Sequence, residues 1–228
     1  MPFYIPAYDT EAIYPWWELG GRPYDPSSYH KVVSYEGERL QEFLAGVRAV
    51  AEVHLKLNLP ATFFLVAKLL ESAGPELVEI LGQPLFDIQC HSYSHADVIQ
   101  ASQDEAALRH ELLDAKHRIE DTFDRPVIGF TTPAGYWKGL AGQQLVLAAL
   151  WETGYRYVRS FGLGPGKSFP APLTHPYWYT RDGHPDLLEL GLHGWHDNIL
   201  TGQPGRVTWP PSLPWGYPSQ VPRTPEEV

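Results

Sequence analysis

The feature that most constrains the fold is a regular alternation of short apolar runs with longer segments of helical periodicity. Strands are expected over residues 3–8, 61–66, 86–90, 127–130, 155–160 and 187–193. Helices are expected over residues 37–57, 68–81, 103–124 and 140–153. Strands that alternate with helices predict an α/β fold, built on a parallel sheet or closed into an α/β barrel.

Two segments fall outside this alternation. Residues 12–36 are rich in Pro, Gly, Tyr and Trp, and they predict a long loop that is a candidate lid. Residues 203–228 contain seven prolines and predict an irregular C-terminal extension. We therefore expect one main domain over residues 1–202, followed by this extension.

Composition restricts the partners of the chain. There are 17 basic and 27 acidic residues, a formal net charge of −10, which argues against nucleic acid or an anionic membrane surface as the main partner. The sequence contains no run of about 18 apolar residues, the length that predicts a membrane span. No secretory signal is visible, so the cytoplasm is the default expectation, with secretion not excluded if a leader was trimmed. The oligomeric state has no signature in the sequence.

Several polar residues come at or just after the ends of the predicted strands. They are Asp9, His91, Thr131 and His193. In α/β barrels the chemistry gathers at the C-terminal ends of the strands. We therefore expect these residues to share one site.

The strongest local motif is His91-Ser92-Tyr93-Ser94-His95. Its two histidines would share one face if the segment formed a helical turn, and neutral imidazole is a good ligand for Zn²⁺. Two imidazoles and the carboxylate of Asp9 would leave positions for water and substrate. The alternatives are two unrelated polar histidines and a capping aspartate. Because Cys90 is the sole cysteine, no internal disulfide or cysteine cluster is expected.

The ordered motifs resemble the polysaccharide deacetylase family (the NodB homology domain, carbohydrate esterase family 4) over roughly residues 3 to 197. The matching segments are Asp9-Thr10-Glu11, Ala61-Thr62-Phe63-Phe64, His91-Ser92-Tyr93-Ser94-His95, Thr131-Thr132-Pro133-Ala134-Gly135 and Leu190-Gly191-Leu192-His193. The resemblance implies a distorted (β/α) barrel.

The resemblance also implies a metal site and an acid. Asp9, His91 and His95 would hold a divalent metal ion, Zn²⁺ first, with Co²⁺, Mn²⁺ and Ni²⁺ as other candidates. His193 would protonate the leaving amine as general acid, and His196 is its near rival.

A substrate groove is implied as well. Pro133 and Gly135 would shape one wall, and a backbone N–H near Tyr136 would help to hold the oxyanion. Tyr136, Trp137 and Trp195 would stack on a sugar ring, although packing at the rim explains them equally well.

The first motif departs from the family pattern, which usually has an Asp pair. Aligned on Asp-x-Asp, Asp9 is the metal ligand and Ala7 stands where the base belongs. Aligned on Asp-Asp, Asp9 is the base and Thr10 replaces the ligand. The first alignment is preferred here.

The third motif departs as well, because Thr131 stands where the family has an Arg that steadies the base. With base and partner both missing, Glu11 is the first candidate for a substitute base. Asp25, Asp97 or a metal-bound hydroxide are the alternatives.

The resulting hypothesis is a metal-dependent hydrolase that removes N-acetyl, or O-acetyl, groups from a carbohydrate. A second hypothesis is a hydrolase of C–N bonds in small amides or ureides. A third is a catalytically silent relative that binds carbohydrate or has a structural role.

Overall fold

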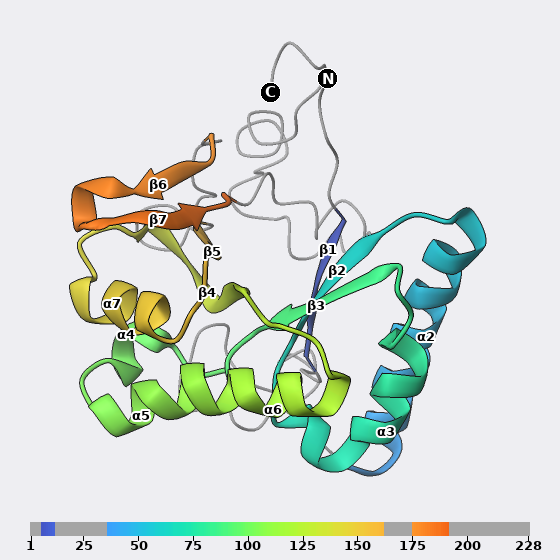
Figure 1. Cartoon of the computed structure of the whole chain (residues 1–228). Coiled ribbons are helices and arrows are strands. Elements are labelled where there is room, and N and C mark those ends of the chain that lie inside the picture. Colours follow the sequence, from blue (N-terminus) through green and yellow to red (C-terminus); the bar gives the residue numbers. More distant parts are fainter. Residues whose placement is uncertain (1–5, 12–35, 162–174, 192–228) are drawn as a thin grey trace, which may run out of the picture.

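The computed structural model describes residues 6–11, 36–161 and 175–191, and its centre is a seven-stranded sheet (Figure 1). The strands are β1 (Ala7–Thr10), β2 (Ala61–Leu65), β3 (Phe86–Cys90), β4 (Gly129–Leu140), β5 (Tyr157–Phe161), β6 (Tyr177–Tyr179) and β7 (His184–Glu189). Their order in the sheet is β1-β2-β3-β4-β5-β7-β6. Every neighbouring pair is parallel except β6 and β7. This mostly parallel sheet confirms the expected α/β class.

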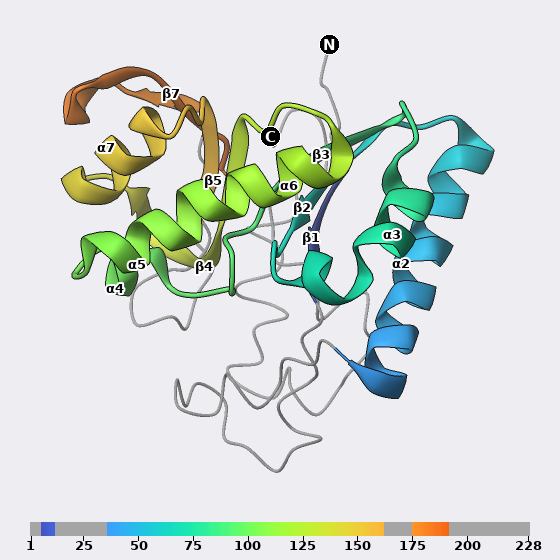
Figure 2. The ribbon, with the colours of Figure 1, turned by 60° about the horizontal axis from the view of Figure 1, so that its bottom comes forward.

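Helices pack along one side of this sheet. They are α2 (Gly37–Leu57), α3 (Leu69–Leu81), α4 (Val98–Ala101), α5 (Glu105–Arg109), α6 (Ala115–Phe123) and α7 (Gln144–Glu152). A π-helical turn, η2 (His110–Asp114), joins α5 to α6, and a 3-10 turn, η4 (Thr180–Asp182), joins β6 to β7. In Figure 2, α5 and α6 cross in front of the strands, with α2 and α3 on one side and α7 on the other. None of the described helices is long and apolar enough to cross a bilayer.

Helix α2 shows how the sequence produces this layer. Its buried side chains recur three or four residues apart, which places them on one face. They are Leu40, Leu44, Val47, Ala51 and His54. The helix ends at Asn58, whose left-handed backbone (φ 52°) lets its N–H bond the carbonyls of His54 and Leu55.

The strands bury side chains on both faces, as parallel strands usually do. Phe63 belongs to the core between sheet and helices, stacked on Tyr8 and edge-on to Phe86. Phe64, the next residue, points to the opposite face, where its ring contacts Tyr157 and the guanidinium of Arg159. That second face carries the polar residues described below.

Several expected boundaries differ from the structure. The helix expected over 103–124 is broken into α5, η2 and α6, and β4 continues to Leu140, so that α7 begins only at Gln144. β6 had no counterpart among the expected strands, and β7 ends at Glu189. Residues 12–35 of the candidate lid and the extension 203–228 lie outside the described residues, so the division into domains stays a prediction.

Candidate metal centre

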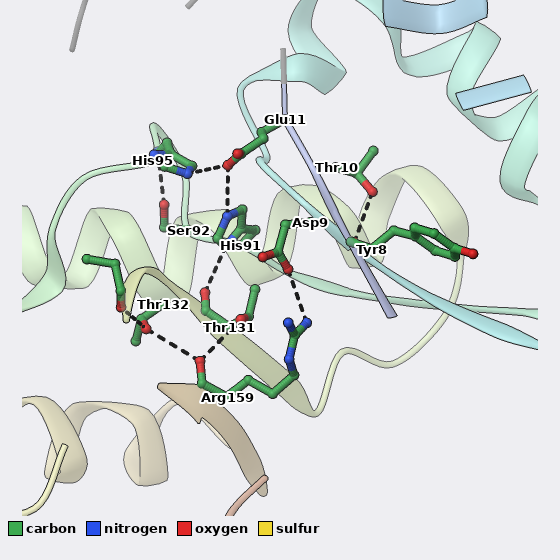
Figure 3. A network of polar contacts seen from close by, with 11 residues as sticks. Tyr8, Asp9, Thr10, Glu11, His91, Ser92, His95, Thr131, Thr132 and Arg159 are labelled. Carbon is green, nitrogen blue, oxygen red and sulfur yellow. Dashed lines mark hydrogen bonds and ion pairs between the residues drawn. The ribbon is translucent and has the colours of Figure 1, made fainter. Parts of the chain in front are cut away.

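The register of four neighbouring strands brings the polar residues to one level of the sheet. Thr10 is opposite Leu65, Leu65 opposite Cys90, and Cys90 opposite Phe130. The residues that follow Thr10, Cys90 and Phe130 are therefore at one height, so that Glu11, His91 and Thr131 meet there (Figure 3). Asp9 pairs with Phe64, two residues nearer the start of the strands.

His91 is held from both sides. Its ring is buried, and its Nδ1 lies 3.0 Å from the carbonyl oxygen of Thr131. A carbonyl only accepts hydrogen bonds, so Nδ1 carries the hydrogen and Nε2 is directed at Oε2 of Glu11, 3.0 Å away. Fixing one ring nitrogen through a backbone carbonyl is how proteins orient a metal-binding imidazole.

His95 reaches the same carboxylate by an irregular loop. The segment His91–His95 is not the helical turn considered from its spacing, because Ser92 (φ 63°) and His95 (φ 66°) both have left-handed backbones. Such a conformation costs roughly 1–2 kcal/mol for each non-glycine residue. The Ser92 hydroxyl accepts the N–H of His95 at 2.9 Å, and Ala67 N–H donates to the Ser92 carbonyl at 3.0 Å. His95 Nε2 contacts Oε2 of Glu11.

Within the described part of the chain, Glu11, His91 and His95 form a group that could hold a metal ion. One ligand atom from each lies within 4.8 Å of the other two, and both histidines are buried. Burial raises the pKa of Glu11, but hydrogen bonds from His91 and His95 outweigh this and hold it well below its ordinary value. Burial lowers the pKa of His91, but the hydrogen bond to Glu11, the negative charges of Asp9 and Glu11 and the bond to the Thr131 carbonyl together raise it above its ordinary value. His91 Nε2 and Glu11 Oε2 are both acceptor atoms, and at 3.0 Å they require a proton or a cation between them. Two imidazoles and a carboxylate are ligands that suit a divalent cation.

Asp9 has a different partner from the one expected. Arg159 Nη1 donates to its Oδ1 at 3.1 Å, and the Arg159 side chain, 12% exposed, passes over the Phe64 ring (Figure 3). The expectation gave Asp9 to the metal and the role of base to Glu11. The structure places Glu11 against both imidazoles instead, because the strand register puts it, and not Asp9, level with His91.

Strand β4 forms an irregular wall beside this centre. Thr131 is opposite Arg159 and Tyr136 is opposite Phe161, so five residues of β4 advance against two of β5. Pro133 and Gly135, two expected wall residues, lie in this bulge, and such bulges commonly re-aim side chains next to active sites. Tyr136 donates its hydroxyl to Oδ1 of Asp97 at 2.8 Å.

A family model for polysaccharide deacetylases matches residues 45–158, half of the 228 residues. The chain belongs to the polysaccharide deacetylase family. The match spans the Ala61–Phe64 strand, the His91–His95 loop and the Thr131–Gly135 turn of this deacetylase-family chain. A search of curated proteins finds no significant match.

Solved structures show the same fold. One is a polysaccharide deacetylase provisionally assigned in Mycobacterium smegmatis, with 20% identity, a TM-score of 0.55 and coverage of 82% of this chain and 57% of that one. Another is a polysaccharide deacetylase provisionally assigned in Pseudomonas aeruginosa PAO1, with 18% identity, a TM-score of 0.52 and coverage of 82% of this chain and 60% of that one. The likeness confirms the distorted barrel type of this family. The deacetylase-family chain spans less than two thirds of either structure.

The remaining expected residues are placed as follows. Asp97 caps the N-terminus of α4, where its Oδ1 accepts the N–H of Ile99 at 2.9 Å. The side chain of Trp137, Asp25 and residues 192–228 lie outside the part of the chain that the structure describes. His193, Trp195 and His196 belong to that last segment, so their roles stay predictions.

Two residues near the candidate site, Arg159 and Glu111, were not identified from the sequence. Arg159 lies in an ordinary strand, and only the curvature of the sheet brings it to Asp9. Glu111 lies in a helical segment of alternating charge, where a carboxylate usually faces solvent, yet it is only 5% exposed. A buried-face position in the helical periodicity of residues 103–124 is the signal that could have identified it.

Proposed function

We propose that this chain is a metal-dependent hydrolase that removes an acetyl group, N-linked before O-linked, from a carbohydrate. Membership of the deacetylase family supports the reaction class. The observation that carries the proposal is the meeting of Glu11, His91 and His95 within 4.8 Å, beside the Asp9–Arg159 pair.

Glu11, His91 and His95 would hold the ion, Zn²⁺ before Co²⁺, Mn²⁺ or Ni²⁺. When bound, it supplies Lewis acidity that activates water and polarises the acetyl carbonyl. Thr131 contributes through its carbonyl, which keeps the hydrogen of His91 on Nδ1 and leaves Nε2 free as a donor atom.

In this proposal Asp9 is the general base and Arg159 positions it. Asp9 takes the proton of the attacking water, while the guanidinium holds the carboxylate in one orientation. Thr131 stands where the family Arg is expected, and its hydroxyl donates to the backbone carbonyl of Arg159 at 3.2 Å. The cationic partner of the base therefore comes from β5 in this chain.

His193 would return a proton to the departing nitrogen or oxygen, as the resemblance implies. The β4 bulge with Pro133 and Gly135 would form one groove wall, with a backbone N–H near Tyr136 facing the oxyanion. Trp137 and Trp195 would supply stacking surfaces for a sugar ring.

The other two hypotheses receive less support. The absence of the family's base residue is what favours hydrolysis of small amides. Asp9, paired with Arg159, is a candidate for that base, so this reason loses weight. A silent relative has no evident need for three converging ligand atoms, of which two belong to buried imidazoles.

The test is acetate release from N-acetylated and O-acetylated oligosaccharides by chelator-treated protein, before and after addition of each metal. We expect release only with metal, and its loss in His91→Ala. His184→Ala is the matched control, because His184 lies at the start of β7. Release that is unchanged by chelation or by His91→Ala would overturn the proposal, and metal-dependent hydrolysis of small cyclic amides alone would replace it with the second hypothesis.

A further inference from the structure

The loop that carries both histidines is held from behind by one buried carboxylate. Oε2 of Glu111 accepts the backbone N–H groups of Tyr93 (3.0 Å) and Ser94 (2.9 Å). Oε1 accepts the hydroxyl of Ser94 at 2.6 Å. One side chain thus accepts three hydrogen bonds from Tyr93 and Ser94, two of the three residues between His91 and His95.

Glu111 itself lies in the π-helical turn η2, and π-helical turns recur at functional sites. The preceding residue also contacts the loop, since the His110 ring lies 4.1 Å from the Tyr93 ring, centre to centre. The Tyr93 hydroxyl donates to Glu71 of α3. The loop is therefore attached to η2 by two consecutive residues and to α3 by a third contact.

The loop needs such support because its backbone is strained. Ser92 and His95 adopt left-handed conformations that non-glycine residues rarely keep without surrounding constraints. The Ser92 hydroxyl constrains His95 from within the loop. Glu111 constrains the two residues between them, whose N–H groups would otherwise be left without these bonds.

We propose that Glu111 is a positioning residue for the candidate metal centre, which fixes the His91–His95 loop so that both imidazoles converge on Glu11. This inference rests on the proposed metal set. Residues that orient metal ligands typically contribute about 10-fold to 100-fold to metal affinity. Glu111 is assigned that effect here, in addition to any contribution to folding.

The test measures Zn²⁺ and Co²⁺ affinity by competition with a chromophoric chelator, together with the visible spectrum of the Co²⁺ form and the Tm of chelated protein. We expect Glu111→Ala to weaken binding by about 10-fold to 100-fold and to alter the Co²⁺ spectrum. Glu111→Gln should stay within about 3-fold of the parent, because its amide oxygen can accept both N–H groups and its NH₂ can donate to Ser94.

Glu120→Ala is the matched control. Glu120 lies nine residues further along the same helical run and also accepts a backbone N–H, that of Val127 at 2.9 Å. Its loss should lower Tm and leave metal affinity and the Co²⁺ spectrum unchanged. If Glu111→Ala weakens binding no more than Glu120→Ala does, Glu111 is structural only and the inference fails.

If Glu111→Ala does not fold, Ser94→Ala tests the positioning role of Glu111 in its place. It removes one of the three bonds, and we expect affinity to fall by roughly 3-fold to 10-fold. Unchanged affinity would overturn the inference. Failure of the parent chain to bind either ion would instead overturn the proposed metal set, so the two failures are distinguishable.

Discussion

Arg159 donates to Asp9 across four strand intervals of the sheet, with Nη1 and Oδ1 3.1 Å apart. In a flat sheet, adjacent strands are about 4.8 Å apart, so β1 and β5 would be separated by roughly 19 Å, farther than these side chains can span. The contact therefore requires the sheet to curve toward a barrel. Curvature brings together a carboxylate and a guanidinium that are 150 residues apart in sequence.

Replacement of Arg159 by Met should lower the rate of deacetylation and leave the metal in place. The change keeps most of the contact with Phe64 and removes the cation that orients Asp9. We expect kcat to fall by about 10-fold to 100-fold, part of what a general base contributes. Arg156→Met is the control, because within the described residues the Arg156 guanidinium donates to backbone carbonyls near the end of α7. Equal kcat in the two variants would count against the role of Arg159.

Asp9→Asn and Glu11→Gln should affect different quantities, the reaction rate and the metal affinity respectively. Glu11→Gln should weaken metal affinity by at least about 10-fold, since it removes a ligating carboxylate. Asp9→Asn should leave affinity within a few fold and lower kcat by about 10²–10⁴-fold, the contribution of a base. Isothermal titration and acetate assays separate the two. The reverse pattern would restore the assignment expected from the sequence alone.

Glu189 should make the fold less stable as pH rises. Its carboxylate is fully buried and accepts hydrogen bonds from Ser160, Phe161 and Tyr179. Burial raises its pKa above the ordinary 4.5 by more than these bonds lower it. The folded state thus retains the proton longer than the unfolded state, so the free energy of unfolding falls from about pH 4.5 up to the folded pKa.

Urea denaturation of the parent and of Glu189→Gln at several pH values checks this. The stability of the parent relative to the variant should decline with rising pH across that window, because Gln does not titrate. A difference that stays constant or grows with pH would show that the folded pKa of Glu189 is not raised.

Gly139→Ala should destabilise the protein more than Gly142→Ala. Both glycines have left-handed backbones, with φ of 57° and 82°. A Cβ on Gly139 would lie 3.0 Å from the Ser160 and Tyr179 hydroxyl oxygens, whereas one on Gly142 meets nothing within 4 Å. We expect a loss of about 1 kcal/mol for Gly142→Ala and about 2–3 kcal/mol for Gly139→Ala in thermal unfolding. Equal losses would show that the crowding is relieved without cost.

Much of the architecture could be predicted because its causes are local. The apolar periodicity of residues 37–57 and 61–66 determines which segments become helix and strand, and the structure confirms α2 and β2 nearly to the residue. The departures also have local causes that are harder to see. Pro133 and Gly135 produce a bulge that extends β4, and η2 adds an extra residue to one helical turn.

The strand–helix alternation, the family motifs and the place of the two histidines after β3 follow from local patterns in the amino-acid sequence. Which carboxylate meets the histidines does not, because the choice between Asp9 and Glu11 depends on the register of β1 against β2 and β3. The partners Arg159 and Glu111 were likewise decided by sheet curvature and helix packing. Register, curvature and packing arise from contacts between residues far apart in the chain; a local pattern such as the helical periodicity around Glu111 indicates that a side chain is buried, but not which residues it contacts.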